Sequence, residues 1–513
     1  MYAATRARTW DNLGNNQVLY QLSYGGLLAL CRSGVVQIWL SFSRGCDHRR
    51  FLERGGRSEG MTETDAVLRA VRERVDPTAA ERERLRTVAE RLVERAEDAV
   101  DERGLDADVV RVGSTARGTW VRGDRDIDVF VRFPPSLSRD ELETHGLAVG
   151  NAVLPNGHEE YAEHPYVKGE FEGYDVDLVP CYAVESARDI RSAVDRTPFH
   201  TEYLEARLDD DLAADVRLCK QFLKGIGAYG SDLKTEGFSG YLTELLVLEY
   251  DGFEALLATA ADWQPPVELD PAGHANASFD DPLVVVDPTD PERNVAAVVS
   301  AANVARFQHY ARRFREEPRE SYFFASPRDP LDAEGVRAAL DERGTRALAV
   351  RFDDDSLLDL VEDQRYPQLR RSLDGLVRGL EERGFEVVRA ATWADETAVL
   401  FCELSVAALP AVERHRGPPV HVGGHASGFY EKYADDPDVY GPYIEGERYV
   451  VERERDVRSA AAFAEEELAS VALGHAVERL VAADDYTVLA DAEVAALAAE
   501  FGREFAAYFD PRP

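Results

Sequence analysis

Lysine, methionine and cysteine are scarce in this chain of 513 residues, which has five lysines against 54 arginines, two methionines and five cysteines. The cysteines form no Cys-x-x-Cys pair and have no regular spacing. This argues against a disulfide framework or a zinc site and for a reducing compartment, so we expect a cytoplasmic protein. Long apolar runs are also lacking, because Arg32 interrupts the stretch 25–40 well short of the roughly 20 residues of a membrane span. We therefore expect no membrane partner.

Positive charge is in short supply as well, since 96 acidic residues outnumber 59 basic ones and give a formal net charge of −37. An acid excess with so little lysine is typical of proteins that work in molar salt, and it predicts an extremely halophilic source. At about 1 M salt the Debye length shrinks to roughly 3 Å, so distant surface charges are screened while contact pairs survive. The acidic surface therefore does not exclude an RNA partner, whose binding would depend on shape, stacking and local basic contacts.

Residues 1–60 differ from the rest of the chain in charge. They carry 8 arginines and 4 acids, a net charge of +4, so residues 61–513 carry the remaining −41. Met61 is the sole methionine after Met1, and it opens an acidic, amphipathic segment that is typical of the remaining chain. We interpret residues 1–60 as a non-native or disordered N-terminal extension and Met61 as the native start.

The motif that carries chemistry begins with a Gly-Ser turn at 113–114, which offers backbone N–H groups and a hydroxyl to a phosphate. Asp126 and Asp128 follow at the start of an alternating apolar run, so on a strand their carboxylates share one face. Asp177 lies in a second run with the same alternation. Carboxylates held side by side suit Mg²⁺ that carries substrate phosphates. Three of them beside a phosphate cradle favour two-metal phosphoryl or nucleotidyl transfer.

Two alternatives accompany this interpretation. Asp124 and Asp175 lie on the same strand faces as the proposed ligands, so a register error in the assignment would bring them in instead. A lone Asp-x-Asp is also common on solvated strand edges. The Gly-Ser turn that precedes Asp126 and the second acidic strand favour a metal site over a solvated strand edge.

In its detail the chain resembles the archaeal (class I) CCA-adding enzymes, which are tRNA nucleotidyltransferases. The resemblance spans most of residues 110–310 in the family's order and is looser beyond about 320. The matching stretches are Gly-Ser-Thr-Ala-Arg-Gly-Thr-Trp-Val-Arg-Gly (113–123), Tyr-Ala-Glu-His-Pro-Tyr-Val (161–167), Val-Asp-Leu-Val-Pro-Cys-Tyr (176–182), Ser-Ala-Val-Asp-Arg-Thr-Pro-Phe-His (192–200), Gly-Phe-Ser-Gly-Tyr-Leu (237–242) and Val-Asp-Pro-Thr-Asp-Pro-Glu-Arg-Asn-Val-Ala-Ala (286–297).

The resemblance implies a role for each matched site residue. It implies that the metal-binding and catalytic carboxylates are Asp126, Asp128 and Asp177, and that Arg293 reads the edge of the incoming base. The residues implied to hold the incoming nucleotide are Ser114, Arg117, His200, Lys220 and Tyr229. The first metal carboxylate is often Glu in this family, whereas Asp126 is one methylene shorter.

The implied activity is template-independent addition of C, C and A to the 3′ end of tRNA from CTP and ATP, with Mg²⁺ as cofactor and pyrophosphate released. It also implies repair of damaged tRNA 3′ ends in a haloarchaeon-like source, and it leaves a homodimer open. A poly(A) or oligoadenylate-type polymerase is the rival within the class, because it shares the same core but would accept ATP alone and keep extending. A catalytically inactive RNA-binding protein is the rival outside it.

The expected architecture is a multidomain α+β fold with a polymerase beta-like nucleotidyltransferase catalytic head at 61–200. A helical neck that contributes to nucleotide binding follows at 201–320, and an RNA-binding α+β body and tail that contact tRNA occupy 321–513. The periodicity predicts helices over 61–105, 215–225, 241–249, 295–314 and 357–383, strands over 348–352, 385–392 and 398–404, and a helical C-terminal stretch. The G-x-G-x-x-G match at 225–230 follows a helix rather than a strand, which argues against a dinucleotide site.

The assignment of Met61 as the native start can be tested directly. Because the basic segment before it does not share the acidic composition of the chain, we expect N-terminal sequencing of the native protein to begin at Met61 or Thr62. Recovery of residues 2–60 in the mature protein would show this expectation to be wrong.

Overall fold

The computed structural model describes residues 19–21, 27–32, 35–40, 62–161 and 163–513. It separates into two compact units, Met1–Met61 and Thr62–Pro513. The described part of the first unit is an antiparallel sheet of β1 (Leu19–Gln21), β2 (Leu27–Arg32) and β3 (Val35–Leu40). The rest of the predicted extension 1–60 lies outside the described residues, and its status stays a prediction.

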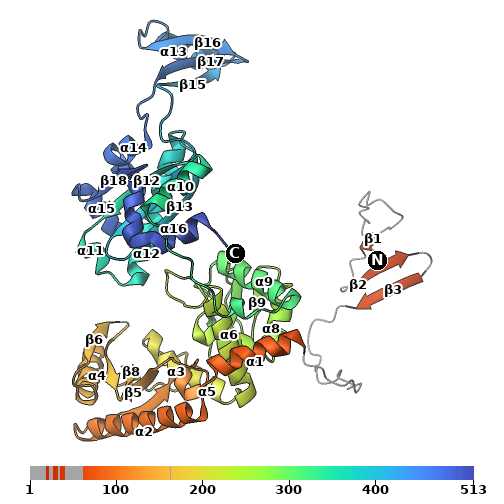
Figure 1. Ribbon diagram of the computed structural model, residues 1–513, viewed down its shortest axis with the longest axis vertical. Helices are drawn as coiled ribbons and strands as arrows, with labels where there is room; N and C mark the ends of the chain where they lie inside the picture. The colour runs from red at the N-terminus through yellow and green to blue at the C-terminus, as the bar shows by residue number, and fades with distance from the viewer. Residues whose placement is uncertain (1–18, 22–26, 33–34, 41–61, 162) are drawn as a thin grey trace, which may run out of the picture. The chain divides into compact units, whose positions relative to one another are not determined.

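The head is built on a five-stranded sheet in the order β4-β5-β8-β7-β6 (Figure 1). Strands β5 and β8 run parallel, and the other neighbours are antiparallel. The alternation expected of the sequence is confirmed, because Ile127, Val129, Val131 and Phe133 of β5 all lie in one buried core. The bounds are β4 (Asp108–Val112), β5 (Asp126–Phe133), β6 (His158–Tyr161), β7 (Pro165–Phe171) and β8 (Tyr174–Tyr182).

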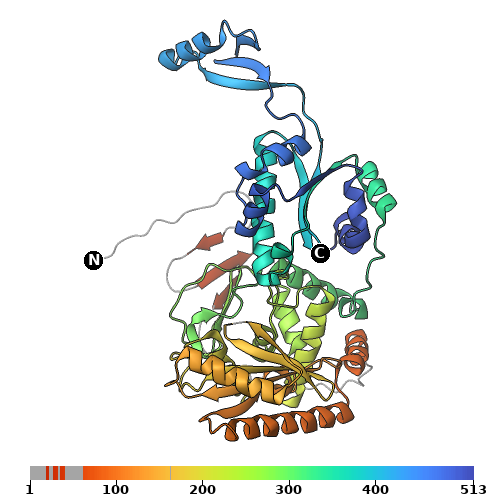
Figure 2. The same cartoon turned by 90° about the vertical axis from the view of Figure 1, so that its left-hand side faces the viewer.

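Helices α2 (Ala79–Asp101) and α4 (Arg139–Val153) cover this apolar face of the head sheet (Figure 2). Each begins with a capping box, formed by Thr78 with Glu81 in α2 and by Ser138 with Glu141 in α4. Short helices α3 (Gly113–Arg117) and α5 (Thr197–Glu205) contact strand β4, and α3 also contacts β5. The opposite face of the sheet carries a smaller apolar cluster that includes Val112, Phe130 and Cys181.

The neck has one core formed mainly by helices, which includes Phe222, Phe253 and Phe307. Helix α1, the first after residue 61, also packs into this neck core through Leu68 and Val71 and not against the head sheet. The predicted helices near 215–225 and 241–249 are confirmed with small changes in their bounds. The helices are α1 (Glu63–Val75), α6 (Asp210–Gly225), α7 (Gly240–Glu249), α8 (Phe253–Ala260) and α9 (Ala301–Glu316).

The expectation of a helix from 295 is wrong, because α9 begins only at Ala301 after the cap at Ser300. The sequence interpretation also missed a small sheet in this region, with the order β11-β10-β9. Strand β10 is buried throughout, so its four consecutive apolar residues lack the alternation that identifies a half-buried strand. The bounds are β9 (Val267–Leu269), β10 (Leu283–Asp287) and β11 (Asp290–Asn294).

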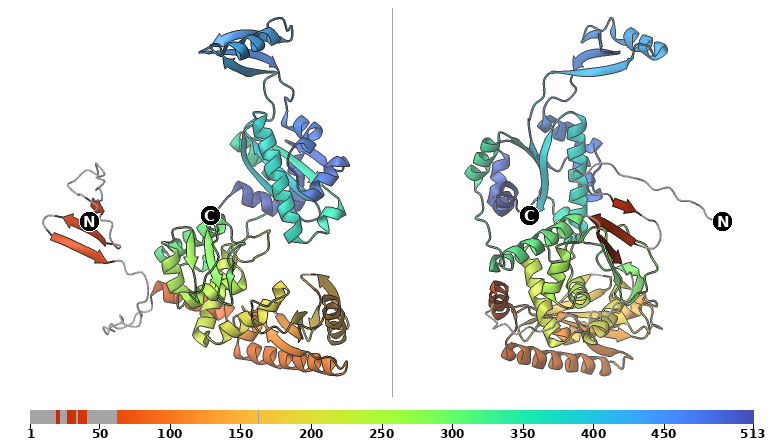
Figure 3. Two further views of the ribbon diagram at one scale, coloured as in Figure 1. Left: turned by 180° about the vertical axis from the view of Figure 1, so that it is seen from behind. Right: turned by 90° about the vertical axis from the view of Figure 1, so that its right-hand side faces the viewer.

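The body is an antiparallel sheet, β13-β14-β12-β18, with helices on both faces. In the right panel of Figure 3, α12 lies on one side of this sheet and α10 and α16 on the other. The predicted helix 357–383 is interrupted, with α11 ending at Leu358 and α12 starting at Glu362. The bounds are α10 (Ala333–Arg343), β12 (Arg346–Phe352), α11 (Asp355–Leu358), α12 (Glu362–Glu382), β13 (Val387–Ala394), β14 (Ala398–Leu404), α14 (Ala460–Glu466), α15 (His475–Ala482), β18 (Thr487–Ala490) and α16 (Ala498–Phe509).

The sequence interpretation missed a separate antiparallel sheet, β15-β17-β16, which carries helix α13 and lies between β14 and the predicted helical C-terminal stretch (Figure 1). Its strands expose much of their surface, so they lack the apolar core face that signals a strand in a sequence. None of the helices in the described ranges combines the length and apolar character that crossing a membrane requires. The bounds are β15 (Val412–Pro419), α13 (Gly423–Tyr433), β16 (Val439–Glu445) and β17 (Arg448–Glu454).

Candidate active site

The three predicted metal carboxylates lie on one face of the head sheet. In the parallel pair β5–β8, Asp128 is the register partner of Asp177, and Asp126 is the partner of Asp175. Because residues two apart on a strand point to the same side, all four side chains face away from the apolar core under α2 and α4. Asp124 lies before the start of β5, where its carboxylate accepts from the Val121 N–H at 3.3 Å. The strand pairing therefore brings together the residues chosen from the sequence, with Asp175 as their neighbour.

The electrostatics of this face show an excess of negative charge. Burial, together with the neighbouring Asp177 and Asp126 carboxylates, raises the pKa of Asp128 to about 6. Burial also raises the pKa of Asp177, although Lys168 opposes the shift with its Nζ atom 3.5 Å from an Asp177 oxygen. One lysine does not neutralise three carboxylates.

The donor set of this face fits a hard divalent cation, because it consists of carboxylate oxygens with unneutralised charge. In the part of the chain that is described, no group of three His, Cys, Asp or Glu side chains is already closed around a metal position. Carboxylates that repel one another stay apart until a cation joins them. The residues present therefore match Mg²⁺ in chemistry, and it is the sheet register that brings them to a common face.

The Gly-Ser turn directly adjoins these carboxylates. Gly113 has a φ of +76°, and a Cβ at this position would lie 1.9 Å from an Asp128 oxygen, so only glycine fits here. Ser114 follows in the short helix α3. The phosphate cradle predicted from the sequence is thus adjacent to the predicted metal carboxylates.

Arg117 and Lys220 meet at a buried carboxylate that the sequence interpretation missed. Glu244 of α7 is fully buried and accepts from the Arg117 Nη2 at 2.7 Å and from the Lys220 Nζ at 3.2 Å. The Thr119 hydroxyl also donates to it. Burial opposes ionisation of Glu244, yet Lys220 and Arg117 hold its pKa below the usual value. The signal in the sequence was a charged residue inside an otherwise apolar helical stretch.

This buried cluster sets one carboxylate against two basic side chains, and burial lowers the pKa of Lys220 while Glu244 opposes that shift. The Arg117 guanidinium also donates to the Thr201 hydroxyl at 3.0 Å, which ties α3 to α5. A basic cluster beside the Gly-Ser turn is suited to a polyphosphate, since charge-assisted hydrogen bonds to phosphate are the stronger kind.

The remaining predicted contacts lie on the neck side. His200 of α5 and Arg293 of β11 both contact the buried carboxylate of Asp287. The sequence interpretation did not single out Asp287. Tyr229 lies just after α6, with the Lys224 Nζ 5.3 Å from its ring centroid, and burial raises its pKa. Asp287 was visible in the sequence only as the acid that ends a wholly apolar run.

Comparison with known proteins finds three family models that match successive segments of this chain. Residues 93–200 match the family described as "Nucleotidyltransferase domain", residues 214–324 match "tRNA nucleotidyltransferase, second domain", and residues 343–491 match "CCA-adding enzyme, C-terminal domain". The CCA-adding enzyme of Halobacterium salinarum is 66% identical over 454 residues, which cover 88% of this chain and 100% of that protein. This chain belongs to the CCA-adding enzyme family.

Other CCA-adding enzymes agree with this assignment. That of Halorubrum lacusprofundi is 59% identical over 467 residues, covering 88% of this chain and 100% of that protein. A solved cytoplasmic RNA terminal U-transferase is a more distant match, 16% identical with a TM-score of 0.39 over 52% of this chain and 99% of that one. The expectations of a nucleotidyltransferase enzyme with a polymerase beta-like head and of a haloarchaeon-like source are confirmed.

The metal-free CCA-adding enzyme should be less stable because of Asp128. The folded state titrates this carboxyl at about 6 against an ordinary value of 3.8, so the unfolded state ionises it more readily. The destabilisation is therefore present above pH 6 and disappears as the pH falls toward 4. We expect Asp128→Asn to raise the free energy of unfolding by about 1–3 kcal/mol at pH 7.5 and to have little effect at pH 4.

The measurement is chemical unfolding in EDTA and high KCl at both pH values. Asp175→Asn on the same sheet face is the matched control, because the Asp175 side chain is exposed. A variant at position 128 that is less stable than the parent at pH 7.5 would contradict the account.

Proposed function

We propose that this enzyme adds C, C and A in turn to the 3′ end of tRNA from CTP and ATP, without a nucleic-acid template and with release of pyrophosphate. We extend the proposal to repair of tRNAs whose 3′ ends are damaged. The observation that carries it is the parallel register of β5 and β8, which sets Asp128 beside Asp177 next to the Gly113 turn. Family membership supports tRNA as the acceptor.

The three carboxylates would hold the metal ions of a two-metal nucleotidyl transfer. When bound there, Mg²⁺ supplies activation of the attacking 3′-hydroxyl and neutralisation of the departing pyrophosphate. The contribution of the protein's own residues would be to position the metal ions. Asp126, Asp128 and Asp177 present their oxygens from one sheet face, and Lys168 balances part of their charge from the adjacent strand β7.

The triphosphate would lie along the Gly-Ser turn. Ser114 would contact it through its hydroxyl and backbone N–H, while Arg117 and Lys220 face it as the charged pair organised by Glu244. Tyr229 completes this side of the site in the proposal. Arg117 is held by a buried partner, so it would need little reorganisation when the nucleotide binds, which is the condition for strong electrostatic assistance. Lys220 is buried and its Nζ already donates to the Thr119 carbonyl, the Thr119 hydroxyl and Glu244, so it would act through its charge.

Selection of C and A over G and U would depend on the edge of the base. Arg293 offers only donors, so it suits the acceptor ring nitrogen that cytosine and adenine carry where uracil and guanine carry an N–H group. Rejecting a base that leaves a buried donor unpaired can be worth several kcal/mol. His200 and Arg293 are the candidates for this role, since both are anchored to Asp287.

The body and tail would bind the rest of the tRNA. Strand β16 exposes Tyr440 at 69% and Ile444 at 60% of their surface. Arg414 and Arg416 of β15, in the same sheet, lie near Glu445. Exposed aromatic rings beside arginines are suited to stacking and backbone contacts with RNA. These contacts depend little on long-range charge, which fits an acidic protein in high salt. A homodimer stays a prediction.

The decisive experiment incubates the full chain in high KCl with tRNA that ends before CCA. CTP and ATP are supplied singly and together, and the products are sized. We expect two residues from CTP alone, three from both nucleotides, and no further growth. Continued extension with ATP alone would favour the poly(A)-type polymerase instead.

In the same assay Asp128→Asn should lower the rate of both C and A addition by more than about 100-fold, because metal-held charge contributes several kcal/mol. Binding of tRNA should persist. Asp175→Asn, which alters a neighbouring carboxylate of the same face, should stay within a few-fold of the parent. Substantial turnover by the variant at 128 would refute the metal assignment.

A further inference from the structure

One buried carboxylate organises two side chains of the candidate nucleotide site. Asp287, the last residue of β10, has a fully buried side chain, whereas its partner Arg293 is 36% exposed. Arg293 lines a pocket of about 540 Å³ together with Arg196 and Asp290, whereas neither Asp287 nor His200 lines it. Asp287 can therefore act on a bound molecule only through its partners.

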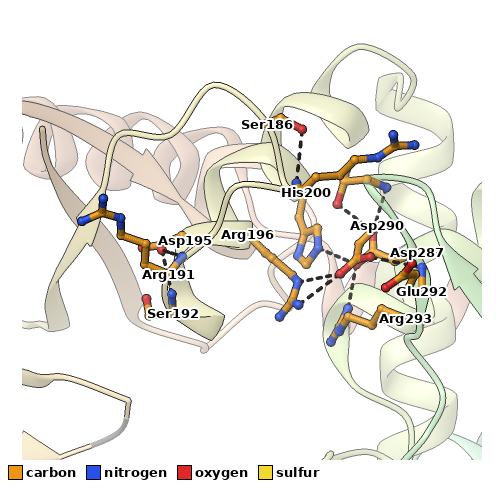
Figure 4. A network of polar contacts seen from close by, with 12 residues as sticks. Ser186, Arg191, Ser192, Asp195, Arg196, His200, Asp287, Asp290, Glu292 and Arg293 are labelled. Carbon is orange, nitrogen blue, oxygen red and sulfur yellow. Dashed lines mark hydrogen bonds and ion pairs between the residues drawn. The ribbon is translucent and has the colours of Figure 1, made fainter. Parts of the chain in front are cut away.

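The two carboxylate oxygens of Asp287 accept hydrogen bonds from different sets of donors. One accepts from the His200 ring nitrogen Nε2 and from the Arg293 Nη1, both at 2.8 Å (Figure 4). The other accepts from the Thr289 backbone N–H at 2.9 Å, from the Thr289 hydroxyl at 2.8 Å and from the Tyr241 hydroxyl at 3.4 Å. The second set holds the carboxylate in one orientation, and this orientation fixes the two side chains on the first oxygen.

His200 is held from a second direction as well. Its ring stacks on Tyr241 with centroids 3.9 Å apart and planes at 15°. With Nε2 donating to Asp287, a neutral imidazole has its lone pair on Nδ1, so Asp287 also decides which nitrogen remains for another partner. The ring is thereby limited in position, plane and tautomer by residues from α7 and β10.

The neighbouring Arg196 forms an ion pair with a different carboxylate, that of Asp290. Arg196 donates to Asp290 through Nε at 3.2 Å and Nη2 at 3.1 Å (Figure 4). Two Arg–Asp pairs thus lie side by side, and each arginine has a separate carboxylate.

We propose that Asp287 is a positioning residue for nucleotide selection, which holds His200 and Arg293 as one unit so that the incoming CTP or ATP meets them in a fixed arrangement. This rests on the proposed function, because that function makes the two side chains nucleotide contacts. Their roles are interdependent, since each occupies the same oxygen of one carboxylate. Specificity between bases then depends on a residue that does not touch the nucleotide.

The test replaces the carboxylate by its isosteric amide, Asp287→Asn, and compares steady-state kinetics with CTP, ATP and UTP. An amide offers one acceptor atom, so it cannot serve both sets of donors. We expect KM for CTP and ATP to rise at least about 10-fold with kcat within about 3-fold, and discrimination of CTP against UTP to fall about 10-fold. A KM within 2-fold of the parent would overturn the proposal.

The matched control is Glu403→Gln in the body. Glu403 is also fully buried, and it accepts from Arg343, from the Thr345 hydroxyl and from the Tyr508 hydroxyl, so the same kind of network is weakened far along the chain. It should change thermal stability but leave KM for nucleotides and the CTP-to-UTP ratio unchanged. An equal rise in KM would mean that a general loss of stability explains both variants, and the proposal would fail.

A milder variant guards against loss of folding at position 287. Thr289→Val removes one hydroxyl donor from the orienting oxygen and keeps the backbone bond, so KM for CTP should rise about 3-fold to 5-fold. An unchanged KM would count against the positioning role.

Equilibrium binding of CTP and UTP without tRNA separates this inference from the proposed function. If the parent binds CTP but adds no CCA, and Asp287→Asn weakens CTP more than UTP, the proposed function fails while the inference stands. If the parent adds CCA and Asp287→Asn binds both nucleotides as the parent does, only the inference fails.

Discussion

The parallel pairing of β5 with β8 is the constraint on which the rest of this structure depends. It places Asp128 beside Asp177 on one face of the head sheet, while the other face packs its apolar side chains under α2 and α4. The arrangement costs stability in the absence of metal, because buried neighbouring carboxylates resist ionisation together. The apolar core on the opposite face offsets that cost and holds the strands in register, since a slip of one residue would turn the carboxylates into the core.

Buried acids organise the positive charges around this face. Glu244 gathers Arg117 and Lys220, and Asp287 gathers His200 and Arg293, so cations from separate segments are held in place before any substrate arrives. In a chain with a net charge of −37, these contacts are short and buried, and salt screens them far less than it screens charges on the surface.

The structural features that could be predicted from the sequence were those whose signal lies in residues close together in the chain. The Asp-x-Asp alternation placed Asp126 with Asp128, and Asp175 with Asp177, on strand faces, because two-residue periodicity defines a strand face without knowledge of the fold. The choice of Asp177 over Asp175 came from the resemblance to the CCA-adding enzymes. The sheet β9–β11 was missed because β10 is apolar throughout, and the sheet β15–β17 because its strands are largely exposed. Glu244 and Asp287 were also missed. Their partners lie up to 127 and 87 residues away in the chain, a separation over which no spacing rule operates.

The amino-acid sequence alone determined the strand faces of β5 and β8, the acidic composition and the motifs that relate this chain to the CCA-adding enzymes, since each follows from neighbouring residues or from resemblance. Tertiary structure alone decided which carboxylate serves which cation. Lys168 could have faced any acid, and it lies at Asp177 because β7 pairs with β8 in that register. Ion pairs between distant segments form only where packing brings them together and excludes water, and the energy of that packing belongs to the folded chain as a whole.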